Sequence, residues 1–195
     1  MSAPSLARQQ VFTDIESSAQ LTREFQPAYI LSLLRTRAYI GEELQTLPSD
    51  QREEIMRRRV ERQAVLRNES KRFEFLLTEG ALRWRLGSPQ LMIEQLQHIE
   101  TLGEQPNVSL GVIPWRERNT VFAGHAFHVY DDDVAVIGTA HAVEVVRDPT
   151  VVEKYARLFA ELWSHAVTGA SAAKELRRIC GEYARLSRLE LLRAR

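Results

Sequence analysis

Residues 72–114, RFEFLLTEGALRWRLGSPQLMIEQLQHIETLGEQPNVSLGVIP, carry the clearest signals of the fold. It opens with Phe73–Leu77, a short apolar run rich in strand-forming residues, and it closes with a second such run, Val108–Ile113. Between them, the pair Ser88–Pro89 marks a helix start, and apolar residues then recur at helical spacing over 91–102. A strand, a helix and a strand in this order predict a parallel βαβ unit with a right-handed crossover.

Working outward, two further strand-like runs follow, Phe127–Tyr130 and Val134–Ile137, joined by the turn Asp131–Asp133. Both are expected in the same sheet as the βαβ unit. We therefore expect an α/β (or α+β) fold with N-terminal helices, a mixed sheet and C-terminal helices. We expect one domain over 1–195, with a helical part over 12–68, a sheet part over 72–168 and a final helix over 171–195.

Composition excludes several classes of protein. The hydrophobic fraction of 44% and the balance of 26 basic against 26 acidic side chains argue against a disordered chain. No apolar run reaches the length of a membrane span, and no secretory signal is visible, so no membrane partner is expected. Because the lone Cys180 cannot form an internal disulfide, we expect a cytoplasmic protein.

The segment Gln51–Asn68 is expected to be an arginine-rich helix, which raises the question of nucleic acid. Its acidic residues partly neutralise the arginines. The chain as a whole has no net positive charge, so binding to a phosphate backbone would gain little from the release of counterions. We therefore expect these arginines to form ion pairs with acids on the same and neighbouring helices, and we do not expect direct DNA binding.

Five runs stand out in order along the chain: Tyr29–Tyr39 (YILSLLRTRAY), Arg58–Leu66 (RRVERQAVL), Phe75–Leu82 (FLLTEGAL), Met92–Leu96 (MIEQL) and Pro106–Pro114 (PNVSLGVIP). Together they resemble the DUF5753 family, an actinobacterial domain. The resemblance implies a sensor of a small molecule or a small partner protein, usually placed after a helix-turn-helix domain in antitoxin-like transcription regulators. Too few residues precede the resemblance for such a head, so either the chain is a stand-alone member of the family or the head lies elsewhere. Of these two, we expect a stand-alone domain.

The segment 125–139 also resembles a degenerate phospholipase-D-type signature, in which His125 matches the nucleophile and Asp132 the acid. Phe127, however, occupies the position of the lysine that would hold the phosphate. Without that positive charge, attack on a phosphodiester lacks its electrostatic support. The resemblance therefore implies a phospholipase-D-like fold without phosphodiesterase activity. Phospholipase-D-type enzymes need two copies of the motif. This sequence holds one, so a homodimer would have to supply the second.

The carboxyl ends of the first strands are the expected place of a ligand pocket, because open α/β sheets bind ligands there. Glu79 ends one strand and Arg83 follows a turn later, and a long loop begins after the other strand. We expect the pocket to use residues from these loops and from the later strands: Glu79, Arg83, Pro114, Trp115, His125, His128 and Glu144.

Two functions remain open from the sequence. The first is a regulatory domain that binds a small molecule or a small partner protein and carries no chemistry. The second is a small-molecule-processing enzyme, in which a histidine and a carboxylate of the same cleft act as acid and base. Its catalytic candidates are His125, His128, Glu79 and Asp132. Metal ligation is the weaker interpretation, because strong ligand spacings are absent, so we expect no metal and no cofactor. Its candidate ligands are His125, His128, His141, the acids Asp131–Asp133, and Glu79 or Glu144.

Overall fold

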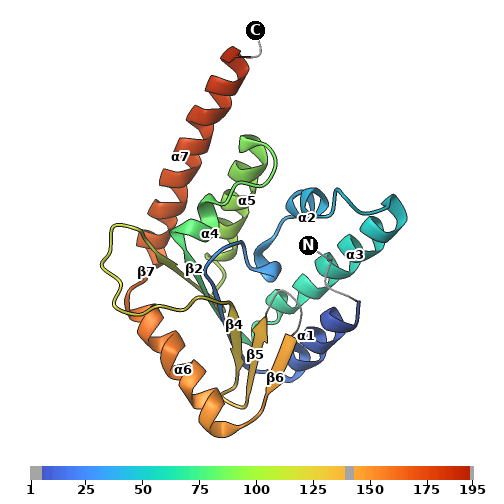
Figure 1. Cartoon of the computed structure of the whole chain (residues 1–195), viewed down its shortest axis with the longest axis vertical. Coiled ribbons are helices and arrows are strands. Elements are labelled where there is room, and N and C mark those ends of the chain that lie inside the picture. The colour runs from blue at the N-terminus through green and yellow to red at the C-terminus, as the bar shows by residue number, and fades with distance from the viewer. Residues whose placement is uncertain (1–5, 139–142, 194–195) are drawn as a thin grey trace.

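In the computed structural model, residues 6–138 and 143–193 are described, and they form a mixed α/β fold with helices at both ends (Figure 1). In chain order the elements are α1 (Leu6–Ser18), β1 (Leu21–Gln26), η1 (Ser32–Leu34), α2 (Arg37–Glu43), α3 (Ser49–Arg62), η2 (Gln63–Arg67), β2 (Arg72–Thr78), α4 (Glu79–Arg83), α5 (Pro89–Leu102), β3 (Val108–Ile113), β4 (Phe127–Tyr130), β5 (Val134–Gly138), β6 (Val143–Val146), α6 (Pro149–Ser164), β7 (Val167–Thr168) and α7 (Gly169–Arg193).

All the strands of the described residues lie in one seven-stranded sheet with the order β6-β5-β4-β1-β2-β3-β7. The neighbouring strands β1, β2 and β3 are parallel, and the remaining strands pair antiparallel on both sides of them. The predicted βαβ unit is confirmed as β2–α5–β3, and the predicted strands near residues 127 and 134 are β4 and β5.

The helix between β2 and β3 begins where the sequence predicts. The Ser88 hydroxyl accepts the backbone N–H of Leu91, and Pro89 takes the first helical position. The same chemistry starts α6, where the Asp148 carboxylate caps the first turn ahead of Pro149. These caps satisfy amides that have no partner within the helix.

The core lies on both faces of the sheet. On one face, α5 and α7 pack over Phe73, Phe75 and Leu77 of β2. On the other face, α6 packs over Phe25 and Phe127. Beyond α5, the distal part of α7 continues away from the sheet (Figure 1).

The helical interpretation of residues 12–68 missed a strand, β1. Its sequence, LTREFQ, alternates along the two sheet faces, with Glu24 on the face opposite to Arg23. Pairing with β2 and β4 places this strand in the centre of the sheet. The arginine-rich helix is largely α3, and ion pairs such as Arg57–Glu54 and Arg59–Glu43 bear out the predicted pairing of its arginines.

Among the described residues, no helix is both long and apolar enough to cross a membrane.

Candidate functional site

Glu79 lies where β2 gives way to α4, at the carboxyl end of the strand. The turn is fixed by Thr78, whose hydroxyl accepts the Ala81 amide at 3.1 Å and donates to the Pro27 carbonyl at 2.6 Å. The Glu79 side chain is only 5% exposed. The loops after β1 and β2 are therefore tied together directly beside a buried carboxylate.

That carboxylate also holds the loop after β3 and the helix α7. Glu79 accepts Nε of Arg83 at 2.6 Å, Nη2 of Arg178 at 2.6 Å and the backbone N–H of Trp115 at 2.9 Å. Pro114, just before Trp115, is buried. One side chain thus joins three segments that are far apart in the sequence.

Further ion pairs extend this contact, and we call the set the Glu79 network: Glu79, Arg83, Arg116, Glu175, Arg178 and Glu182. Burial by itself would raise the pKa of Glu79, but hydrogen bonds from Arg178, the Trp115 amide and Arg83 outweigh it and lower the pKa to about 2. Burial opposes ionisation of Glu175 as well, and hydrogen bonds from Arg116 and Arg178 still lower its pKa. The network is therefore ionised at neutral pH.

One exposed aromatic side chain, that of Trp115, contacts this network directly. The Trp115 ring lies against Arg83, whose guanidinium carbon is 4.9 Å from the ring centre, and the side chain is 65% exposed. The indole lies close to Gly80, since a Cβ at that position would stand 3.6 Å from Nε1 of Trp115, an ordinary van der Waals contact. Other exposed aromatic side chains follow the same strand ends, and we call the set the aromatic edge: Tyr29, Trp84, Trp115 and Phe122.

His125 belongs to a separate cluster on the α6 side of the sheet. Its Nε2 lies 3.0 Å from the hydroxyl of Tyr155 on α6. Burial raises the pKa of Tyr155, and the nearby Glu144 carboxylate raises it further. Of the predicted site residues, His125 and Glu144 therefore share one neighbourhood, while Glu79, Arg83 and Trp115 share another.

The proposed catalytic set of His125, His128, Glu79 and Asp132 is not gathered in one cleft. His128 lies on the face opposite to His125, because three residues along a strand reverse the side-chain direction, and its Nδ1 is 3.4 Å from Oε1 of the fully buried Glu24. Asp132 lies beyond the other end of β4, where it pairs with Arg23.

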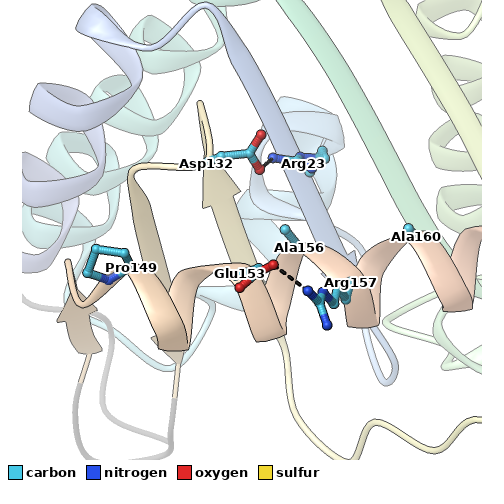
Figure 2. A pocket seen from close by; sticks show the side chains of 7 residues that line it. All are labelled: Arg23, Asp132, Pro149, Glu153, Ala156, Arg157 and Ala160. Atoms are coloured by element: carbon cyan, nitrogen blue, oxygen red, sulfur yellow. Dashed lines mark hydrogen bonds and ion pairs between the residues drawn. The ribbon is translucent and has the colours of Figure 1, made fainter.

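Arg23 and Asp132 line a shallow cavity of about 370 Å³ beside α6 (Figure 2). In Figure 2 these two side chains point toward one another, and the ion pair of Glu153 with Arg157 lies on the helix beside them. The small side chains of Ala156 and Ala160 line the same cavity. This hollow is at the amino end of β1, whereas the sequence places the pocket at the carboxyl ends.

Phe127, the residue in place of the phosphate-binding lysine, is completely buried and packs against Phe25 and Tyr155. Within the described residues, no group of three or more histidine, cysteine or acidic side chains is placed to hold a metal ion. His141, a weaker metal candidate, and Thr139 of the phospholipase-D-type signature lie outside the described residues.

Sequence reasoning missed the partners that complete these clusters. Glu175, Arg178 and Glu182 are spaced three and four residues apart on α7, a visible sign of a charged helix face. That face meets Glu79 only after α7 packs beside the βαβ unit. Glu24 was missed because β1 was not recognised as a strand.

The fold is thus a mixed α/β domain with a buried ion-pair network at the carboxyl ends of its parallel strands. The chain belongs to the DUF5753 family, a domain of unknown function, whose match covers residues 9–178. No curated protein is significantly similar in sequence. Among solved structures, the chain is similar to a phospholipase D family member, Nuc from Salmonella typhimurium, with 13% sequence identity and a TM-score of 0.47. That match covers 83% of this chain and 90% of the other.

Proposed function

We propose that this protein is a regulatory binding domain that recognises a partner protein through the aromatic edge and performs no chemistry there. The observation that carries the proposal is Trp115, which is two-thirds exposed and yet held in place from two sides. Its backbone N–H is bound to Glu79, and its ring lies against Arg83.

Such a residue resembles the anchors of protein interfaces. A tryptophan that is already fixed loses little conformational freedom on binding, and tryptophan and arginine are enriched among residues that dominate binding energy. Trp84 and Phe122, exposed by 67% and 91%, add apolar surface at the same strand ends. Exposed apolar surface of this kind favours a macromolecular partner.

The proposal is tested by native mass spectrometry of the protein purified from its own host. We expect a co-purifying protein that is retained by the wild type and lost from the double variant Trp84→Ala/Trp115→Ala. The control is Leu191→Ala, because Leu191 is also 65% exposed but lies on the distal part of α7. Retention of the partner by the tryptophan variant would refute the proposal, and a co-purifying small molecule lost in the same way would change the partner class.

A second candidate is an enzyme centred on His125, favoured by the contact of its imidazole with the Tyr155 hydroxyl and by the nearby Glu144. An exposed histidine beside a phenol and a carboxylate is a reasonable proton-transfer group. This candidate requires a co-purifying small molecule that the wild type converts and the folded variant His125→Gln does not. Equal conversion by the two proteins would exclude it.

A further inference from the structure

The edge of the sheet at β3 is only partly covered. Strand β3 pairs with β2 along its whole length, from Val108 to Ile113, but β7 pairs with it only at Gly111 and Val112. After Thr168 the chain leaves the sheet through Gly169, which has a φ of 53°, and enters α7. The first half of β3 is therefore paired with β2 on its inner side and, among the described residues, has no strand on its outer side.

The direction of the backbone groups follows from one contact in the neighbouring ladder. Phe73 donates its N–H to the carbonyl of Asn107 at 2.9 Å, so the backbone N–H and C=O groups of Asn107 and Ser109 point toward β2. Those of Val108 and Leu110 point the other way, to the outer side of β3. The amide of Leu110 and the carbonyl of Val108 thus point to the open edge, beyond the ladder with β7. The N–H of Val108 is already donated to Gln105 at 3.1 Å.

A groove of about 560 Å³ runs along this edge. Its lining includes Val108, Ser109 and Leu110 of β3, together with Trp163 of α6 and Ala173 of α7. Because α6 and α7 cover opposite faces of the sheet, a cavity lined by both lies at the edge between them. Its volume is large enough for a few residues of extended chain.

The groove also has a charge preference. Glu100 lines it from the last turn of α5, Glu104 lines it from the segment just after that helix, and Arg177 lines it from α7. Arg177 pairs with Glu100 at 3.1 Å, so that Glu104 is left without an ion-pair partner among the described residues. One uncompensated carboxylate favours an occupant with a basic side chain.

We propose that the open half of β3 is a peptide-binding site, which takes an extended segment of a partner polypeptide carrying a lysine or arginine. The segment adds a strand beside Val108–Leu110, hydrogen-bonds to the outward amide and carbonyl, and places its basic side chain near Glu104. This site lies at the amino end of β3, whereas the aromatic edge lies at the carboxyl ends. The inference is therefore independent of the proposed function.

The test uses the full chain to select from a library of displayed random twelve-residue peptides, followed by synthesis of the enriched sequences. We expect enrichment of β-branched residues with at least one lysine or arginine. Methylation of one backbone nitrogen of the best peptide should weaken its binding about tenfold or more, because a strand hydrogen bond is lost. Calorimetry provides the dissociation constants.

Two variants locate the site. Ala173→Trp fills the groove and should weaken the peptide about tenfold or more, and Glu104→Gln should weaken it several-fold. Ala170→Trp is a second filling variant at an exposed lining position, used if Ala173→Trp melts early. Ala184→Trp, on the same helix but outside the groove, should leave binding unchanged. The inference is overturned if no basic peptide is enriched, if N-methylation has no effect, or if the folded filling variants bind as well as the wild type.

Discussion

Replacing Glu79 by glutamine keeps the shape of the side chain and removes its charge. Glu79 receives hydrogen bonds from Arg83, Arg178 and the Trp115 amide, and its side chain is almost fully buried. A pKa lowered from 4.5 to about 2 corresponds to about 3 kcal/mol of stability at neutral pH. Two charge-assisted hydrogen bonds, at about 1.5–3 kcal/mol each, contribute about 3–6 kcal/mol, and the oxygen of a glutamine would keep part of this through neutral hydrogen bonds. We expect Glu79→Gln to lower the free energy of unfolding by about 2–3 kcal/mol.

The pH dependence gives the sharper test. Because the folded-state pKa of Glu79 is lower than the unfolded-state value, its contribution is fully present above about pH 4.5 and is lost as the pH falls toward 2. Urea unfolding of wild type and variant should therefore differ at pH 7 and converge at low pH.

The matched control is Glu153→Gln, which breaks the exposed ion pair with Arg157 and should cost at most about 0.5 kcal/mol. A pH-independent difference between wild type and Glu79→Gln, or a difference at pH 7 no larger than that of the control, would refute the reasoning.

Three further predictions concern other parts of the chain. The Lys71 ammonium caps α1 by donating to the carbonyls of Glu16, Ser17 and Ala19. Lys71→Met should therefore lower the free energy of unfolding by about 1–3 kcal/mol and speed amide hydrogen exchange in α1 but not in α5. Unchanged exchange in α1 would contradict this. Gly111→Ala should lower the unfolding free energy by about 1–3 kcal/mol, because its Cβ would stand 2.9 Å from Cδ1 of Leu76, whereas Gly138→Ala meets nothing within 4 Å and should be tolerated in the same melting assay. The protein should not hydrolyse bis(p-nitrophenyl) phosphate, because the buried Phe127 cannot supply the missing cation; turnover abolished by His125→Ala would show otherwise.

The local order of the elements was predictable because it depends on signals a few residues apart. Ser88 and Pro89 start α5 wherever it packs, and the apolar runs of β2 and β3 are strands because they are short and bounded by turns. The parallel pairing of β2 and β3 then follows from the crossover helix between them. The position of Glu79 at a strand end was also readable, since β2 ends at Thr78.

The partners of the site residues were decided only by the tertiary structure. Arg178 is 99 residues from Glu79, and nothing local shows that α7 packs beside the end of β2. The polar strand β1 is a strand because two neighbours pair with its backbone, and this pairing is what sets Glu24 opposite His128. Local chemistry therefore determined the secondary-structure elements and the strand ends. Long-range packing determined which charged residues meet at those ends, because a buried ion pair forms only when two segments that are distant in the sequence pack together.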